Sequence, residues 1–261
     1  MSRVGELKLW GCLVVCAAVG GLVGSAAADM SDVIFRIEVS NLAGEASFEV
    51  DVSQGSWKAM PNYDTMPGHS VQPVWEWRLQ HSLGIRDAEG DLIATLDGGG
   101  IELMADPQVN LNFALTAGSS LTTVSIYSSL LSFPTISQAE GRASAGFAIT
   151  DSNGDGATLT PLGAGAYLTQ YNGFVPTGAT FSETLDAFSA PMFQSANNDT
   201  NVPATGYNAI PVPVSDISTQ IEFTLTAHDF ATGTSTFEVV PEPSAVLLLV
   251  LGGFALARRR S

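Results

Sequence analysis

Much of this chain alternates apolar and polar side chains with a period of two, which is the spacing of a strand that buries one face. The alternation is clear in residues 33–39, 46–52, 109–115 and 221–225. Turns rich in glycine, asparagine and aspartate lie between such segments, and a helical pattern is confined to the two ends. We therefore expect an all-β fold, a single antiparallel β-sandwich or flattened barrel of roughly a dozen short strands.

The same pattern divides the chain into three parts. Residues 1–28 form an expected signal peptide, residues 29–238 the β-sandwich domain, and residues 239–261 a C-terminal tail. Proline, asparagine and serine crowd the stretch from about 190 to 216, so a long loop is predicted there. The fold is thus expected to be flanked by an N-terminal signal helix and a short C-terminal transmembrane helix.

The N-terminal segment has the layout of a secretory signal. Arg3 and Lys8 precede an apolar run over residues 12–24, and small residues follow it. Ala26 and Ala28 occupy the positions that signal peptidase reads, which predicts cleavage after Ala28 and export of the chain.

Both cysteines of the chain, Cys12 and Cys16, lie inside this segment. A lipoprotein signal ending at Cys16 is the alternative, but Val15 stands where a small residue is usual. In either case the domain that follows has no disulfide, and its stability depends on core burial.

The C-terminal tail combines a proline break, an apolar segment and a basic end. Residues 244–257 span only about 21 Å as a helix, less than the roughly 30 Å of a bilayer core. An ordinary tail anchor is the alternative, but such anchors are usually longer. The residues of the expected sorting signal are Pro241, Glu242, Pro243, Arg258, Arg259 and Arg260.

This tail resembles the PEP-CTERM sorting signal, which has also been labelled an ice-binding protein C-terminal domain. The resemblance implies processing by an exosortase-type membrane transpeptidase, with transient anchoring in the inner membrane followed by a place at the cell envelope surface or in extracellular matrix. The body is similar to planctomycete-type hypothetical proteins with this tail, through Asn-Leu-Asn-Phe at 110–113, the turn at 151–156 and the approach at 233–239. This second resemblance carries no catalytic residue onto the chain.

The net charge of the β-domain limits which molecules it can bind. Residues 29–241 hold 24 of the 26 acidic residues but only 5 of the 10 basic ones, a formal charge of −19. Such a surface repels nucleic acid and anionic polymers unless cations bridge them, so we expect no nucleic-acid partner. Exopolysaccharide stays a candidate partner.

One turn has the oxygen spacing of a calcium loop. Asp151, Asn153 and Asp155 place side-chain oxygens at alternate positions before Gly156, as an EF-hand loop does. The twelfth position is Leu162 instead of glutamate, and the flanks look like strands. Asn-Gly and Asp-Gly are also strong hairpin-turn pairs, so a plain turn without cofactor is the alternative.

Two tryptophans form the other candidate site. Trp75 and Trp77 lie two residues apart, so on a strand they share a face, on which sugar rings can stack. The alternative is that both rings fill the core of the sandwich.

Motifs of common enzymes are missing. The sequence has no Gly-x-Ser-x-Gly, no His-Glu-x-x-His and no phosphate-binding loop, and its three histidines are scattered. We expect no catalytic residues and a non-enzymatic cell-surface or extracellular-matrix protein; the alternative is a carbohydrate- or calcium-binding β-module at the envelope.

Overall fold

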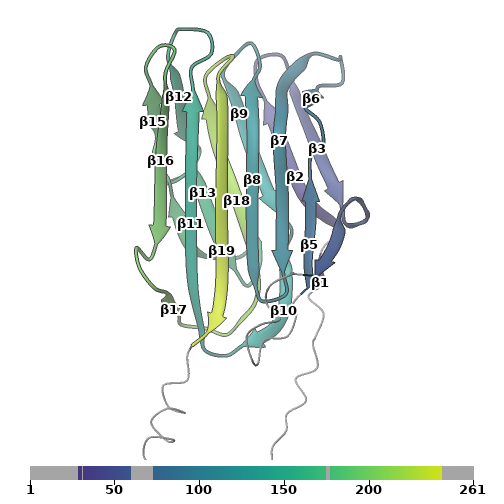
Figure 1. Ribbon diagram of the computed structural model, residues 1–261, viewed down its shortest axis with the longest axis vertical. Coiled ribbons are helices and arrows are strands. Elements are labelled where there is room, and N and C mark those ends of the chain that lie inside the picture. The colour runs from purple at the N-terminus through teal and green to yellow at the C-terminus, as the bar shows by residue number, and fades with distance from the viewer. Residues whose placement is uncertain (1–28, 31, 60–72, 175–176, 243–261) are drawn as a thin grey trace, which may run out of the picture.

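The computed structural model describes residues 29–30, 32–59, 73–174 and 177–242. Their strands form two sheets in which every pairing is antiparallel (Figure 1). The first sheet has ten strands: β1 (Asp29–Met30), β2 (Val33–Ser40), β3 (Glu45–Asp51), β9 (Thr122–Ser128), β10 (Leu131–Ile136), β12 (Ala157–Pro161), β13 (Tyr167–Tyr171), β14 (Ala179–Thr184), β15 (Phe188–Ala190) and β18 (Val214–Leu225).

The second sheet has nine strands, and its main path runs β16-β11-β19-β8-β7-β5-β4. It consists of β4 (Ser56–Ala59), β5 (Pro73–Arg78), β6 (Leu83–Arg86), β7 (Leu92–Met104), β8 (Gln108–Ala117), β11 (Ala139–Thr150), β16 (Ser195–Val202), β17 (Asn208–Ile210) and β19 (Phe230–Pro241). A 3-10 turn, η1 (Val52–Gln54), follows β3.

The sheets face each other across one shared core, because each strand turns its apolar residues inward. β8 and β11 alternate buried and half-buried positions along their whole length, as the period of two predicts. Phe113 and Phe147 meet edge to face with ring centroids 5.3 Å apart. Phe223, from the opposite sheet, lies 5.7 Å from Phe113, so these rings join the two layers.

The expected all-β, antiparallel architecture is confirmed in this sandwich-like form. The alternating segments 33–39 and 46–52 lie in β2 and β3 and the residue after β3, and these two strands pair antiparallel from Ser40↔Glu45 onward. Both expected terminal helices lie outside the described residues. Within the described residues, no helix has the length and apolar character needed to cross a membrane.

Two expectations differ from the structure. The predicted loop at about 190–216 contains β16 and β17, which pair with β11. The apolar residues of β16 are one alanine and one valine. The strand lies at a sheet edge and none of its residues is fully buried, so it needs no large apolar side chains. In addition, β19 continues to Pro241, three residues beyond the predicted domain boundary at 238.

The two ends of the described body lie at the same end of the sheets. β1 and the final residues of β19 are both at the lower end of Figure 1. Phe230, at the start of β19, pairs with Thr150 at the opposite end. Twelve residues of extended strand separate these ends by about 40 Å.

Candidate metal site and other predicted site residues

The Asp151 turn connects the two sheets. β11 belongs to the second sheet and β12 to the first, so residues 151–156 carry the chain across the end of the sandwich. The Asn-Gly and Asp-Gly pairs do form a tight turn, and the strands that it joins belong to different sheets and do not pair with each other. Gly154 and Gly156 have φ of 90° and 93°, a conformation that favours glycine.

Backbone donors hold the buried Asp151 carboxylate in place. Its Oδ1 accepts a hydrogen bond from the Gly154 N–H at 3.0 Å, and its Oδ2 accepts one from the Phe193 N–H. Burial favours the protonated acid, but these bonds together with bonds from Asn153 and Gly156 outweigh it. The pKa of Asp151 therefore lies below its ordinary value, and this carboxylate is ionised at neutral pH.

Asn153 and Asp155 bind each other across the same turn. The Asn153 Oδ1 accepts from the Asp155 N–H at 3.2 Å, and the Asn153 Nδ2 donates to Asp155 Oδ2 at 3.1 Å. The same Nδ2 also donates to the Ala227 carbonyl at 3.2 Å, which ties the turn to the β18–β19 connection. Asn153 thus positions the carboxylate of Asp155.

A third acid, Asp229, joins this turn from just before β19. It is fully buried; its Oδ1 accepts from the Ser152 N–H at 3.2 Å and its Oδ2 accepts from the Thr226 hydroxyl. Burial raises the pKa of Asp229, hydrogen bonds from Thr226 and Ser152 oppose this, and the charges of Asp151 and Asp155 raise it further. Sequence spacing offered no signal for Asp229, because 77 residues separate it from Ser152.

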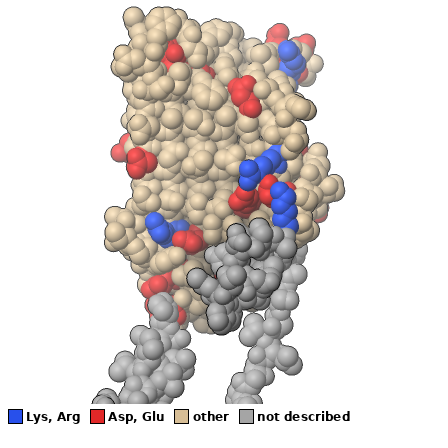
Figure 2. All heavy atoms as spheres, in the orientation of Figure 1, with Lys and Arg blue, Asp and Glu red and all other residues tan. Residues whose placement is uncertain are grey.

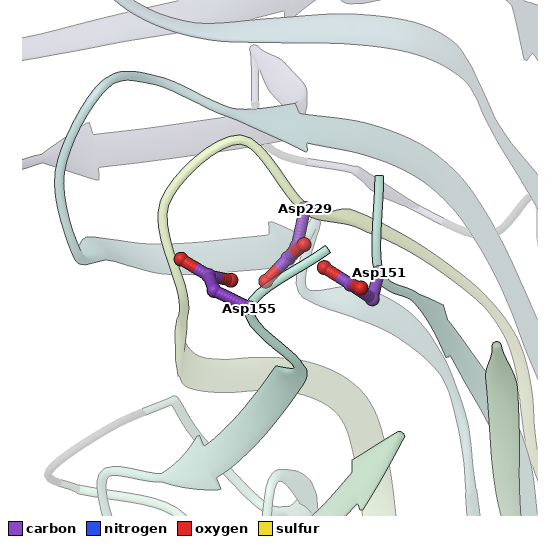
Figure 3. Close-up of side chains that lie close together, drawn as sticks. All are labelled: Asp151, Asp155 and Asp229. Carbon is purple, nitrogen blue, oxygen red and sulfur yellow. The ribbon is translucent and has the colours of Figure 1, made fainter. Parts of the chain in front are cut away.

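Figure 3 shows the three aspartates close together, with the carboxylates of Asp151 and Asp229 turned toward each other and that of Asp155 beside Asp229. One carboxylate oxygen of each lies within 4.8 Å of the others. Calcium binds oxygen at 2.3–2.6 Å, so two ligands on opposite sides of one ion are about 4.8 Å apart. The spacing of the three carboxylates is therefore compatible with a divalent cation, for which these residues would supply three of the six to eight oxygens that calcium takes.

Beyond Asp151, Asn153 and Asp155, this loop differs from an EF-hand. Leu162 is exposed just after β12 and donates its backbone N–H to the Glu222 carbonyl at 3.4 Å. The loop is flanked by strands, and its third carboxylate comes from another connection. Exposed Phe193 lies beside the turn, and its ring occupies the space that a Cβ on Gly154 would need.

The predicted tryptophan platform is wrong for Trp75, because its ring is part of the core. Trp75 is 1% exposed and its Nε1 donates to the Val52 carbonyl at 3.2 Å. Trp77 is half-buried and packs against Phe35, with ring centroids 5.3 Å apart. Two large rings facing the opposite sheet add core area, which explains why the alternating pattern placed them on one face.

Only part of the predicted sorting signal lies in the described residues. Pro241 pairs with Ala139 as the last residue of β19, and the Glu242 N–H, just beyond the strand, donates to the Gln138 carbonyl at 2.9 Å. Pro243, Arg258, Arg259 and Arg260 lie outside the described residues, as do the predicted cleavage residues Ala26 and Ala28.

Comparison with known proteins adds no assignment. No protein-family model matches the chain, and no curated protein matches it.

Proposed function

We propose that this chain is an exported, non-enzymatic protein that is sorted through its Pro-Glu-Pro tail and displayed at the cell envelope or in extracellular matrix. The observation that carries the proposal is the shared location of β1 and the end of β19. A body whose two ends leave on one side can be tethered there while its opposite end, about 40 Å away, stays accessible. Signal peptidase and an exosortase-type transpeptidase are the proposed processing partners, and exopolysaccharide is the proposed neighbour.

The sheet also limits where the tail is accessible to cleavage. Because Glu242 bonds to Gln138, an enzyme that cuts before this residue has to draw the end of β19 out of the sheet. Cleavage after Glu242 leaves every described strand pairing intact. We therefore expect the mature protein to end at or beyond Glu242.

The test compares the full chain with a chain that ends at Glu242, both expressed in a host with exosortase. Fractionation and mass spectrometry of the C-terminus show where each protein resides and where it is cut. The proposal predicts a processed full chain at the envelope, and release of the truncated one. Replacing Pro241, Glu242 and Pro243 by alanine should block processing, whereas Glu140→Gln, a change in the neighbouring strand, should not. A mature surface protein that retains Arg258–Arg260 contradicts the processing step.

A second candidate function is calcium binding at the turn that joins the sheets. The observation that favours it is the third carboxylate, since Asp229 completes a cluster that Asp151 and Asp155 only begin. Extracellular calcium modules typically bind with dissociation constants of about 0.1–1 mM. At 10 mM calcium such affinities add roughly 1.4–2.7 kcal/mol of stability.

Asp229→Asn separates cation binding from structure. Asparagine retains an oxygen for the Ser152 N–H but removes one of the three charges. We expect the wild-type chain to melt at a higher temperature in calcium than in EDTA, and Asp229→Asn to melt alike in both. Asp199→Asn, on an exposed strand, is the matched control and should keep the calcium response. Equal wild-type melting in calcium and EDTA excludes this candidate.

A further inference from the structure

The second sheet ends at β16 with an edge of unusual regularity. All eight residues of β16 pair with β11 in unbroken register, from Ser195↔Thr150 to Val202↔Ala143. Among the described residues, β16 has no strand partner on its other side. Long, regular edges offer unpaired backbone donors and acceptors to another strand, and natural proteins usually protect them.

Other edges in the described part of the chain carry such protection. β3 exposes Glu45, Glu49 and Asp51, and β4 has only four residues, one of them Lys58. β1, β15 and β17 are two or three residues long, and the pairing of β14 with β13 contains a register shift. β16 has a single charged residue, Asp199, and no proline within its span.

The surface beside β16 is also short of charge. Where β11 pairs with β16, the outward positions of β11 and β19 include these small neutral residues: Ser144, Gly146, Ala148, Thr150, Thr232, Thr234 and Thr236. The charged residues Glu140, Arg142 and Glu238 lie beyond this stretch. Figure 2 shows an uncharged area over the left and middle of this face, with acidic side chains at its left edge and mixed charges to its right and below. The body has a formal charge of −19, but on β16 itself a second copy meets only one charged side chain, that of Asp199.

We propose that two copies of this chain pair through β16, antiparallel and around a two-fold axis, so that their second sheets become one continuous sheet. The outer-face residues of β16 are Ser195, Asn197, Asp199 and Asn201, which are all exposed. Facing residues of antiparallel strands share one side of a sheet, so odd-numbered residues must face odd-numbered ones.

One register satisfies this condition with favourable contacts. With the axis at Asn198, Asn197 of each copy faces Asp199 of the other. This gives two equivalent pairs, in each of which the asparagine amide donates to the carboxylate. Ser195 then faces Asn201. The register shifted by one step, with its axis at Asp199, brings two carboxylates together and is disfavoured.

The proposed pairing of two copies depends on the fold alone, so its test is independent of the proposed sorting function. The test is light scattering coupled to size-exclusion chromatography of the full chain in mild detergent, over about 1–100 µM, the range of weak interfaces. We expect a concentration-dependent dimer. Thr200→Lys puts a cation on the inner side of the edge, where a partner strand would bury it, and should weaken dimerisation by at least about tenfold. Thr234→Lys, the same change on central strand β19, should leave the dimer intact.

Crosslinking gives a second measurement that does not depend on Thr200→Lys folding correctly. With Cys12 and Cys16 replaced by serine, Asn198→Cys should form a disulfide dimer on mild oxidation, because residue 198 faces its own copy. Thr234→Cys should stay monomeric. A wild-type chain that is monomeric throughout, or a dimer that Thr200→Lys leaves unchanged and Asn198→Cys does not crosslink, overturns the proposal.

Discussion

The substitution Gly233→Ala measures how tightly the two sheets are packed. It lies on the inner face of β19, and a Cβ placed there would be 2.5 Å from Phe113 Cε1 and 2.5 Å from Phe147 Cδ1. Carbon atoms in good contact are about 3.5–4.0 Å apart, so Gly233→Ala requires the rings to move by about 1 Å. Both rings are buried and contact Phe223, which leaves them little free space.

The expected loss of stability follows from two opposing terms. Overpacking a filled core costs about 1–3 kcal/mol, while replacing glycine by alanine restricts the unfolded chain and recovers about 0.4–1 kcal/mol. We therefore expect Gly233→Ala to lower the free energy of unfolding by about 1–2 kcal/mol. The assay is equilibrium unfolding in urea followed by tryptophan fluorescence, since buried Trp75 reports on the core.

Gly146→Ala is the matched control on the adjacent strand. Its Cβ would meet only the Asp199 Cβ at 3.7 Å, an ordinary contact, so its stability should be unchanged or slightly higher. Adding Phe113→Leu to Gly233→Ala should relieve part of the penalty, because it removes the Phe113 ring atom that the new Cβ meets. If Gly233→Ala is as stable as Gly146→Ala, the packing argument is refuted.

Three further changes test other parts of the molecule. Trp75→Ala should cost about 3–5 kcal/mol of unfolding free energy, because it empties a core position, and a sugar-binding role would instead leave stability unchanged. A hydrogen bond from Lys58 lowers the pKa of Glu76, burial opposes this shift, and the charges of Arg78 and Lys58 lower the pKa further. Ionised Glu76 therefore contributes about 0.5–1 kcal/mol of stability above pH 4–5, which is lost as the pH falls through the folded pKa. Glu76→Gln should be less stable than wild type at pH 7 and equally stable in acid, as measured by urea titrations. Asn172, at φ of 53°, bonds to the Pro213 carbonyl and the Ser215 N–H, so Asn172→Ala should lose more stability than Asn172→Gly, by about 1 kcal/mol, in thermal melts; equal losses would contradict a role for its backbone conformation.

Local patterns were sufficient for the strands that bury one face. The alternation in residues 109–115 and 33–52 identified strands and their inward sides, because the pleat repeats every two residues whatever lies opposite. The same reasoning failed for β16, whose Asn- and Ser-rich sequence resembles a loop. Its strand conformation comes from pairing with β11, a long-range interaction that leaves no local pattern.

For the candidate site, the sequence by itself determined the Asp151–Gly156 turn and its oxygen spacing, and likewise that Trp75 and Trp77 share a strand face. Only the tertiary structure decided that the turn crosses between sheets, that Asp229 joins it from the other connection, and that Trp75 faces the core. The physical reason is the same in each case. Side-chain chemistry and spacing are local, whereas burial and the meeting of distant residues depend on which strands pair and which faces of the sheets meet.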